Sequence, residues 1–345
     1  MAAGSVQQRF PFPVIPSGWF VIAMSEELRP GQIVPRRYFD RDLAMYRTQA
    51  GAVRVVDAFC PHMGAHLGYQ GKVEGEELTC QFHGFSYELS GQCVRTGSGG
   101  KAPNAALRRW IVKEQSGMIL IWHDAAGRAP DWEVPPLPEA GFNAIAWKRF
   151  SFPGHPQETT ENSVDYGHFL KTHGFPAANT GGELRIDGPV LHAQYGIRRA
   201  IHKTLLPKVT MSVHFDVMVH GLGYSQVDGH IPEFNTDIRL FVLPIPVDGE
   251  NVDLVLGASC RSKFKPFSPI ARWVAIRMLC NEVEQDIVVW RHKRHLLRPQ
   301  LAKSEEAVAT YRRWCRQFYP DVDALRELQL DHVVELDREI GTGLG

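Results

Sequence analysis

Two short segments of the sequence each combine a cysteine with a histidine, as Cys60-Pro-His62 and Cys80-Gln-Phe-His83. Turn-forming residues follow both pairs, which predicts that each pair lies on a loop. Two thiolates and two imidazoles suit either a tetrahedral zinc ion or a two-iron cluster in which two histidines replace two cysteines on one iron. Zinc modules usually pair cysteine with cysteine and histidine with histidine. The mixed pairs therefore favour the cluster, with each loop giving one thiolate to one iron and one imidazole to the other.

A second set of candidate metal ligands lies between residues 161 and 173. On a helix, Asn162, Asp165 and His168 share one face. A glycine and a proline soon after His173 would end that helix, so that His173 can turn back toward His168. Two neighbouring imidazoles suit iron, copper, nickel or zinc. A lone histidine is more often structural, but two histidines behind an asparagine and an aspartate favour a metal site.

A third ligand can be sought by helical phase, because iron sites that activate O₂ commonly combine two histidines with one carboxylate. The expected helix 269–296 carries an apolar stripe made of Trp273, Ile276, Leu279, Val283, Ile287 and Trp290. Asp286 lies beside this stripe, whereas Glu284 lies on the opposite side and Glu282 at the edge. A carboxylate buried in an apolar face needs a compensating charge, which either a metal or a salt bridge could supply.

The elements around these residues fall into two groups. In the first, short β-runs separated by turns predict an all-β domain with the cluster loops at one end; they are residues 19–24, 33–37, 43–48, 53–58 and 119–122. In the second, strands 145–152, 184–186, 190–195, 209–219, 238–244 and 252–260 accompany helices 156–171, 269–296 and 304–318. An antiparallel sheet with helices against it is an α+β architecture, and a long helix over a curved sheet leaves a ligand-sized cavity.

The chain of 345 residues is long enough for two hydrophobic cores. A segment rich in proline and glycine, residues 124–143, lacks periodicity and predicts a linker. The expected divisions are an N-terminal arm at 1–17, the β-domain at 18–123, the linker, and a second domain at 144–345.

Composition excludes several classes of function. With 38 basic and 38 acidic residues, the chain has no electrostatic case for nucleic acid or an anionic membrane. The other four cysteines have no framework spacing, which favours a reducing compartment. The N-terminus lacks a leader pattern and no apolar run is long enough to span a bilayer, so a cytoplasmic protein is expected. No Gly-x-Gly-x-x-Gly follows a strand, so electrons would come from a partner.

These two motifs together resemble the oxygenase component of a Rieske non-heme iron oxygenase over residues 16–319. The resemblance rests on Cys60-Pro-His-Met-Gly-Ala-His-Leu, on Cys80-x-x-His-Gly, and on Glu161-Asn-x-x-Asp-x-x-His-Phe-x-x-x-His-Gly. The segments 284–290 and 311–319 are similar to the branch with 3-ketosteroid 9α-hydroxylase and cholesterol 7-desaturase. Respiratory Rieske proteins carry extra cysteines where Ala65 and Phe82 stand here, which favours the oxygenase or ferredoxin type.

The resemblance implies two iron centres and a fold. The ligands of the Rieske [2Fe-2S] cluster would be Cys60, His62, Cys80 and His83, and those of a mononuclear Fe(II) would be His168, His173 and Asp286. The second domain would have a helix-grip-like fold. Asp165 would bridge His168 and His83 of a neighbouring subunit, and Asn162 is a further candidate near the iron.

The resemblance also implies partners and a reaction. Electrons from NAD(P)H would arrive through a separate flavin reductase, often with a ferredoxin, at a homotrimer. The expected reaction is hydroxylation, desaturation or oxidative demethylation at an unactivated C–H bond of a bulky hydrophobic substrate, a steroid or sterol. An aromatic or other cyclic secondary metabolite is the alternative. A Rieske-type electron carrier would leave the residues from Asn162 to His173 without a purpose, and a ligand-binding protein with a structural zinc site is a further alternative.

Overall fold

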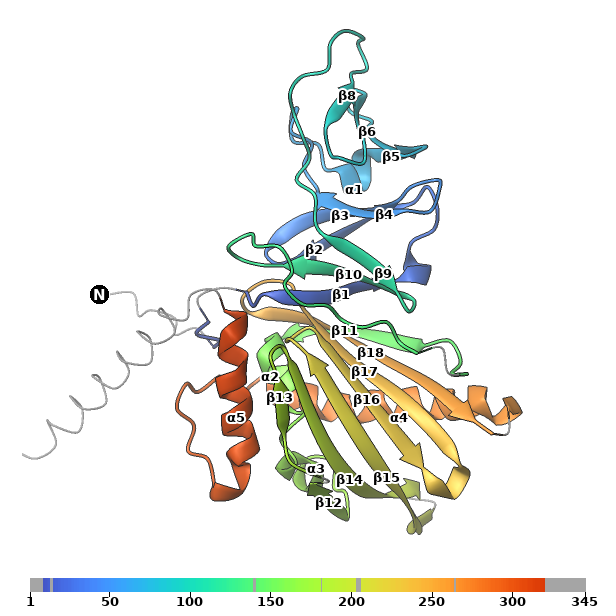
Figure 1. The fold of residues 1–345 in the computed structure, drawn as a ribbon, viewed down its shortest axis with the longest axis vertical. Helices are drawn as coiled ribbons and strands as arrows, with labels where there is room; N and C mark the ends of the chain where they lie inside the picture. Colours follow the sequence, from blue (N-terminus) through green and yellow to red (C-terminus); the bar gives the residue numbers. More distant parts are fainter. Residues whose placement is uncertain are drawn as a thin grey trace, which may run out of the picture.

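The protein consists of antiparallel β-sheets stacked along its long axis, with helices packed against the largest sheet (Figure 1). The computed structural model describes residues 9–12, 15–138, 141–180, 182–202, 206–263 and 265–319. This arrangement confirms the predicted α+β class, with a small β-domain before a large antiparallel sheet. Much of the expected N-terminal arm (1–17) and the end of the chain (320–345) lie outside the described residues.

Three small sheets form the N-terminal part. Their strands are β1 (Gly18–Met24) with β10 (Met118–His123) and β9 (Val112–Gln115); β2 (Ile33–Tyr38) with β3 (Arg41–Arg47) and β4 (Val53–Asp57); and β5 (Gly71–Glu74), β6 (Glu77–Cys80), β7 (Phe85–Tyr87) and β8 (Cys93–Arg95). The predicted runs coincide with the longer strands of this set. The strands β5 to β8 were not predicted, because three or four residues are too few to show an alternating pattern.

The strand β1 connects the two parts of the molecule. All its residues are buried, as expected of a short continuous apolar run. It pairs with β10 and also packs on β16 and β17 of the large sheet. One hydrophobic core therefore extends from the small sheets into the large one.

The large sheet has eight strands in the order β11-β18-β17-β16-β15-β14-β12, with β13 also paired to β14. The strands are β11 (Ala146–Pro153), β12 (Ala177–Thr180), β13 (Arg185–Asp187), β14 (Val190–His202), β15 (Leu206–His220), β16 (Tyr224–Ile231), β17 (Thr236–Pro246) and β18 (Asn251–Ser262). The strand β16 was missed, because buried polar side chains such as Ser225 and Gln226 interrupt its apolar pattern. A tight turn joins β17 to β18 as a hairpin, and the Asp248 side chain in that turn accepts from the backbone N–H groups of Glu250 and Asn251.

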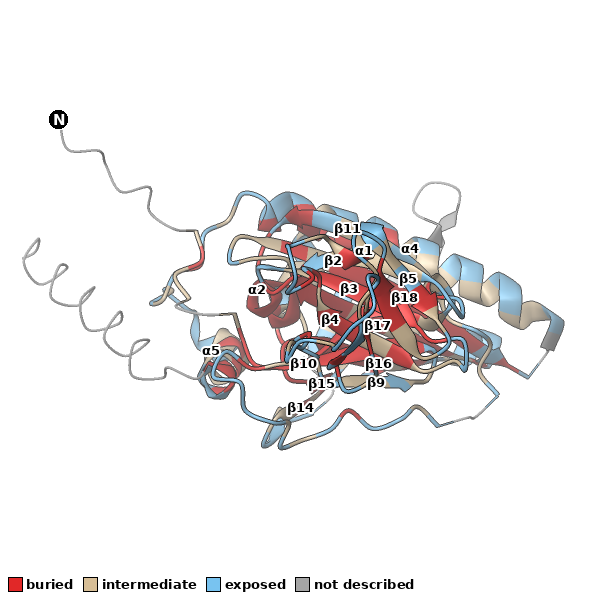
Figure 2. Ribbon diagram, turned by 90° about the horizontal axis from the view of Figure 1, so that it is seen from above, coloured by how far each residue is buried: buried red, intermediate tan, exposed pale blue. Residues whose placement is uncertain are grey.

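Two longer helices pack against this sheet. The helix α4 (Ser268–Trp290) lies across β18, β17 and β11, and α5 (Glu306–Cys315) lies at the other side (Figure 1). One face of α4 remains exposed (Figure 2). Trp273 was predicted to be buried on the stripe but is 60% exposed, with Arg277 over its ring, because the first half of α4 extends to the rim of the sheet. The helix also ends at Trp290 and not at residue 296.

The helix predicted at 156–171 is wrong as a single element. The structure has two short helices there, α2 (Pro156–Glu161) and α3 (Gly167–Lys171), separated by a turn. Val164 is drawn from this turn into the hydrophobic core, and Gly167 disfavours a continuous helix. The positions expected for side chains on one continuous helix over 156–171 therefore do not hold across this turn.

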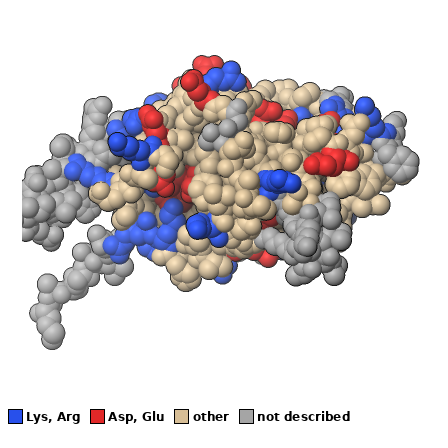
Figure 3. All heavy atoms as spheres, turned by 90° about the horizontal axis from the view of Figure 1, so that it is seen from below, with Lys and Arg blue, Asp and Glu red and all other residues tan. Residues whose placement is uncertain are grey.

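The charged side chains on the surface are mixed in sign, as the equal numbers of acidic and basic residues predict. Seen from below, the molecule has broad uncharged areas between scattered acidic and basic side chains (Figure 3). Within the described residues, no helix is long and apolar enough to cross a membrane.

A buried ionic network ties α2 to the segment that follows α4. Glu158 is 1% exposed, lies 2.5 Å from the ammonium of Lys293 and is hydrogen-bonded to the ring of His295. Burial alone would raise the pKa of Glu158, but its bonds to His295 and Lys293 outweigh burial and lower the pKa to about 2. On the same helix, Glu161 accepts bonds of 2.6 Å and 3.0 Å from Arg312 of α5.

We expect Glu158→Gln to lower the free energy of unfolding at pH 7 by about 2 kcal/mol, because it removes one partner of a buried ion pair. Since the pKa of Glu158 lies below its ordinary value of 4.5, its stabilising contribution is complete above that value and is lost as the pH falls toward 2. Urea midpoints of both proteins between pH 7 and pH 3 should therefore converge on acidification. Glu284→Gln, which removes an exposed pair with Lys148, is the control and should change stability by less than about 1 kcal/mol. Parallel pH profiles for wild type and Glu158→Gln would contradict this role.

Candidate active site

The two cysteine–histidine loops lie at the outer end of the small β-domain and are built alike. In each loop the backbone N–H of a glycine donates to the carbonyl of the cysteine four residues earlier: Gly64 to Cys60 at 2.9 Å, and Gly84 to Cys80 at 2.8 Å. Both glycines have positive φ, 75° and 68°. A Cβ at Gly84 would also lie 2.5 Å from the backbone of Gly97. The shared turn places the cysteine and the histidine of each loop on the same side.

The four side chains divide by burial. The thiols of Cys60 and Cys80 are buried next to each other, whereas His62 and His83 are exposed, with ring centroids 4.7 Å apart. The hydroxyl of Tyr87 lies 3.0 Å from the sulfur of Cys60. Two buried thiols beneath two outward-facing imidazoles match the donor set of a two-iron cluster with mixed ligands.

Four large apolar side chains in and beside these loops are exposed; Phe82 packs against the ring of His83, whereas Phe59 and Tyr69 pack against that of His66. The four are Phe59, Met63, Tyr69 and Phe82, each more than half exposed. We call these four residues the apolar collar. Exposed apolar groups at such density mark a surface that binds another protein.

A second group of candidate ligands comes together at the large sheet. His168 lies on α3, His173 follows that helix, and Asp286 projects from α4. One ligand atom of each lies within 4.8 Å of the others, and Nε2 of His173 is 3.4 Å from Oδ1 of Asp286. Asp286 is only 7% exposed. Two imidazoles and one carboxylate at these separations could hold a non-heme Fe(II).

The ring of His168 is oriented by Asp165. The backbone carbonyl of Asp165 is hydrogen-bonded to Nδ1 of His168, and the Asp165 carboxylate lies 3.8 Å from the same atom. Nε2 of His168 is then available to bind a metal. A histidine that binds a metal usually has its other ring nitrogen held by a hydrogen-bond partner in this way. Burial lowers the pKa of His168, which favours the neutral form that binds metals.

His173 has the opposite shift. Burial would lower its pKa, but the hydrogen bond and charge of Asp286 outweigh burial and raise the pKa. The close approach of the His173 ring therefore partly compensates the buried charge of Asp286. A cation bound by both residues would compensate that charge further.

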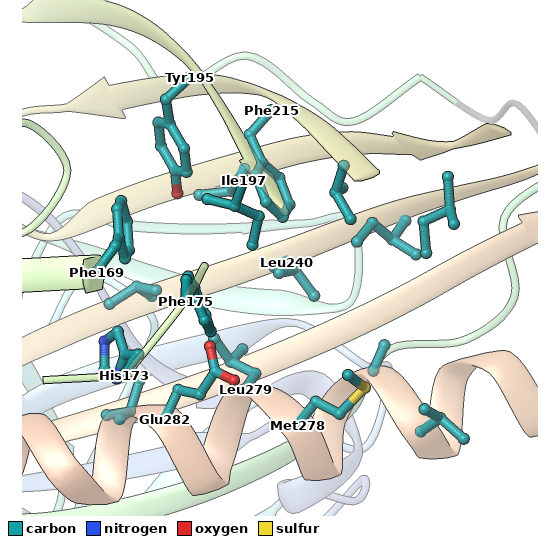
Figure 4. Close-up of a pocket in the computed structure, with 18 of the residues that line it drawn as sticks. Phe169, His173, Phe175, Tyr195, Ile197, Phe215, Leu240, Met278, Leu279 and Glu282 are labelled. Atoms are coloured by element: carbon teal, nitrogen blue, oxygen red, sulfur yellow. The ribbon is translucent and has the colours of Figure 1, made fainter. Parts of the chain in front are cut away.

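A cavity of about 370 Å³ extends from these three ligands between α4 and the sheet (Figure 4). This is the cavity predicted between a long helix and a curved sheet. Its walls are mainly aromatic and aliphatic, and include Phe169, Phe175, Ile197, Phe215, Leu240 and Met278. At one end the exposed side chains Phe234, Ile270 and Val274 form a rim. The size and lining suit a small hydrophobic molecule.

Asn162 and Asp165, the other two predicted residues near the iron site, lie in different surroundings. Asn162 lines the cavity, whereas Asp165 does not line it and instead contacts His168. The cluster loops and α3 lie at opposite ends of the long axis, so Asp165 and His83 do not meet within one chain (Figure 1). His66, which has no predicted ligand role, caps α1 (Leu67–Gln70) by accepting from Gly68.

Two further cavity residues were not predicted as part of the site. Tyr195 projects from β14 and Glu282 from α4. Glu282 precedes Asp286 by four residues and so lies on the same helical face. That spacing is a signal by which Glu282 could have been found, whereas nothing in the sequence around Tyr195 distinguishes it from a core residue.

The chain matches two protein-family models in succession. Residues 18–105 match the Rieske [2Fe-2S] domain, and residues 121–319 match the 3-ketosteroid 9α-hydroxylase C-terminal domain. It is 30% identical to cholesterol 7-desaturase of Bombyx mori, covering 90% of this chain and 70% of that protein. It is 26% identical to the oxygenase component of 3-ketosteroid-9-alpha-monooxygenase of Rhodococcus rhodochrous, covering 89% and 84%.

A solved structure has the same fold. Dicamba monooxygenase bound to dicamba superimposes with a TM-score of 0.71 at 20% identity, over 91% of this chain and 98% of that chain. The order of the two domains and the arrangement of the large sheet are therefore common to both proteins.

Proposed function

Because the chain belongs to the Rieske oxygenases with a 3-ketosteroid 9α-hydroxylase catalytic domain, we propose that it is a terminal oxygenase of steroids or sterols. It uses O₂ and electrons from a separate donor to oxidise an unactivated C–H bond. The observation that carries this proposal is the group His168, His173 and Asp286 at one end of a deep apolar cavity. Hydroxylation, desaturation and oxidative demethylation all remain within this class of reaction.

We assign a ligand set to each iron centre. Cys60, His62, Cys80 and His83 hold the [2Fe-2S] cluster, and their burial and loop geometry support this assignment. His168, His173 and Asp286 hold a mononuclear Fe(II), which when bound supplies the activation of O₂. The corresponding divisions of the chain are an arm (1–17), a cluster domain (18–123), a linker (124–143) and a catalytic domain from residue 144.

The side chains around the second centre have distinct tasks. The apolar walls bind the substrate and exclude water from the site. Asp165 fixes the orientation of the His168 ring, and Asn162 contributes a polar group to the wall near the ligands. The network of Glu158 and Glu161 holds α2 against α5 and the end of α4, and so supports the elements that carry the ligands.

Electron transfer between the centres crosses a subunit boundary in this proposal. The two ligand sets lie at opposite ends of the chain, and the apolar collar beside the cluster loops is exposed (Figure 1). A homotrimer would place the collar of one subunit against the catalytic domain of the next. There, Asp165 would link His168 to His83 of the neighbouring subunit, since a carboxylate can accept from both imidazoles.

The donor is a separate protein, a flavin reductase with or without a ferredoxin, that draws electrons from NAD(P)H. The sequence carries no dinucleotide-binding fingerprint. Apart from the two cluster ligands, the other four cysteines lie in the described ranges as free thiols, which supports a reducing compartment such as the cytoplasm.

The proposal is tested by metal analysis and by turnover. Anaerobically purified protein should contain about three irons and two sulfides per chain. With a reductase and NADH, O₂ uptake and product mass should identify a steroid or sterol from a panel that also contains aromatic and other cyclic compounds. Uptake only with the aromatic compounds would favour the alternative substrate class, and two irons per chain without uptake would indicate an electron carrier.

We expect Tyr87→Phe to lower the reduction potential of the cluster. The Tyr87 hydroxyl lies 3.0 Å from the Cys60 sulfur, and a bond donated to a ligating sulfur stabilises the more negative, reduced state. A difference of ~1 kcal/mol between the two oxidation states corresponds to about 40 mV for one electron. Redox titration followed by the visible spectrum measures the shift, and an unchanged or higher potential would contradict the role of this contact.

A further inference from the structure

A group of large apolar side chains lies exposed at the mouth of the cavity. They are Phe234 at the end of η2 (Pro232–Phe234) and, on the first turns of α4, Ile270, Trp273 and Val274, and each is between 39% and 60% exposed. We call these four residues the mouth patch. The ring of Phe234 lies 6.4 Å from that of Phe267, the residue before α4, so the two parts of the patch are neighbours. A continuous exposed apolar surface of this kind marks a site that binds a protein or a membrane.

The segment that carries most of the mouth patch is basic. Residues 261–281 contain no aspartate or glutamate, and their basic residues are Arg261, Lys263, Lys265, Arg272 and Arg277. On the sheet side of the mouth, Glu233 adds one negative charge, and its carboxylate accepts from the backbone N–H of Ser212. The balanced totals of acidic and basic residues in the whole chain conceal this local excess. A negatively charged surface would therefore be attracted to this end of α4.

The basic side chains around the patch have different partners. Arg261 is paired with Asp237, whereas Arg272 donates to a backbone carbonyl and the guanidinium of Arg277 lies over the ring of Trp273. Neither a carbonyl nor an aromatic ring cancels the positive charge of an arginine. Tryptophan and arginine side by side are typical of helices that lie in a membrane interface, where the ring sits among the lipid headgroups and the guanidinium reaches the phosphates.

The cavity indicates what covers the patch. Its apolar walls extend along α4 from Ile270 at the mouth to Asp286 at the ligand group, a rise of roughly 24 Å (Figure 4). A protein bound on the patch would close this passage, whereas a lipid bilayer would open it to molecules dissolved in hydrocarbon. The subunit contact proposed above lies at Asp165, beside the ligand end of the cavity, and so leaves the mouth patch uncovered.

We propose that the mouth patch and the basic residues beside it dock the protein on an anionic lipid bilayer, so that a hydrophobic molecule passes from the bilayer directly into the cavity. The four apolar side chains enter the level of the headgroups, and the exposed Lys263 and Arg277 contact lipid phosphates. The protein lies on the bilayer surface through one face of α4 (Figure 2). The docking goes beyond the proposed function, because it needs the open apolar cavity and not the reaction that takes place in it.

Flotation with lipid vesicles tests the docking on the complete chain without reductant. Vesicles of phosphatidylcholine mixed with an equal amount of phosphatidylglycerol should bind the wild type, and vesicles of phosphatidylcholine alone should bind it much more weakly. Binding should weaken as salt is added, because salt screens the attraction between exposed charges. Absence of binding to the mixed vesicles at low salt would overturn the proposal, and so would equal binding to both kinds. This comparison needs no variant and so does not depend on how a variant folds.

Three substitutions test which surface binds. Trp273→Glu should weaken binding to the mixed vesicles by at least about 10-fold, since a charge replaces an apolar side chain that enters the interface. Arg277→Gln should weaken it by about 5-fold, which corresponds to ~1 kcal/mol for one basic residue near a charged bilayer. Ile111→Glu is the matched control, because Ile111 is 46% exposed but lies in the small β-domain, directly before β9. Full binding by Trp273→Glu, or an equal loss in Ile111→Glu, would contradict docking through the patch.

The mass of the oligomer in the absence of lipid tests a second copy of the chain as the occupant of the patch. Docking on lipid predicts the same mass for Trp273→Glu and wild type. A smaller oligomer for Trp273→Glu would make the patch an interface between copies and would overturn the proposal.

Delivery from the bilayer is measured as the transfer of a fluorescent steroid from vesicles to the protein. The rate should increase with vesicle concentration, because transfer takes place in the docked complex, and Trp273→Glu should slow it. A rate independent of vesicle concentration would show passage through water and would overturn delivery. None of these measurements involves turnover, so failure of docking leaves the proposed function standing, and failure to oxidise steroids leaves the docking standing.

Discussion

Replacing Asp286 by alanine is expected to remove the mononuclear iron and to abolish turnover while the two-iron cluster is retained. Asp286 supplies the one carboxylate of the three-residue ligand group, and without it two imidazoles remain. The loss of a group that merely orients a ligand typically costs 10- to 100-fold in metal affinity or activity. Removal of a direct ligand should therefore lower activity by more than about 100-fold.

Elemental analysis and spectroscopy separate the two centres in this variant. We expect the iron content of Asp286→Ala to fall by about one per chain, whereas the spectrum of the dithionite-reduced cluster should not change. Glu284→Ala, two residues away on the exposed side of α4, should keep all its iron and its activity. An Asp286→Ala protein with full iron content would show that the ligand set is assigned wrongly.

Asp165→Asn should give a different phenotype, in which both centres are present but turnover is strongly reduced. The backbone carbonyl of Asp165 still orients His168 in this variant, so the iron should be retained. The asparagine side chain, however, carries no charge and cannot accept from two imidazoles through equivalent oxygens. We expect turnover to fall by about 100-fold, the upper end of the range for such outer partners.

Rapid mixing can locate the blocked step in Asp165→Asn. The reductase should reduce the cluster at the wild-type rate, but with O₂ and substrate the cluster should be reoxidised slowly. Turnover near the wild-type value would exclude a role for Asp165 in linking the two centres.

Mixed oligomers test whether electrons cross between subunits. A subunit with His83→Ala lacks a competent cluster but has an intact mononuclear site, and a subunit with Asp286→Ala has the reverse defects. If electrons pass between chains, co-expression of the two inactive variants should restore part of the activity. No recovery in oligomers shown to contain both chains would require a route within one chain.

The sequence alone determined the features that depend on local chemistry. The glycine turns that position the cysteine–histidine loops need only a residue that tolerates positive φ at a fixed distance from each cysteine. The hairpin after β17 follows from the side chain of Asp248, which bonds to its own turn. The candidate ligands His168 and His173 could be selected from their spacing, whereas Asp286 was one of two readings by helical phase and was chosen by the family resemblance. The other residues were each selected from their own neighbours in the sequence, and His173 and Asp286 are themselves far apart along the chain.

Only the tertiary structure decided which groups meet across the cavity. The break between α2 and α3 accompanies the burial of Val164 in the core formed with distant strands, so the phase of one continuous helix does not hold across Asn162 and His168. Glu158 acquires its low pKa from residues that follow α4, and Tyr195 faces Glu282 only because the sheet curves over that helix. The physical reason is that hydrophobic periodicity states which side of an element is buried, but not what lies opposite it. That pairing is fixed by long-range packing, in which the elements of the whole domain find their positions together.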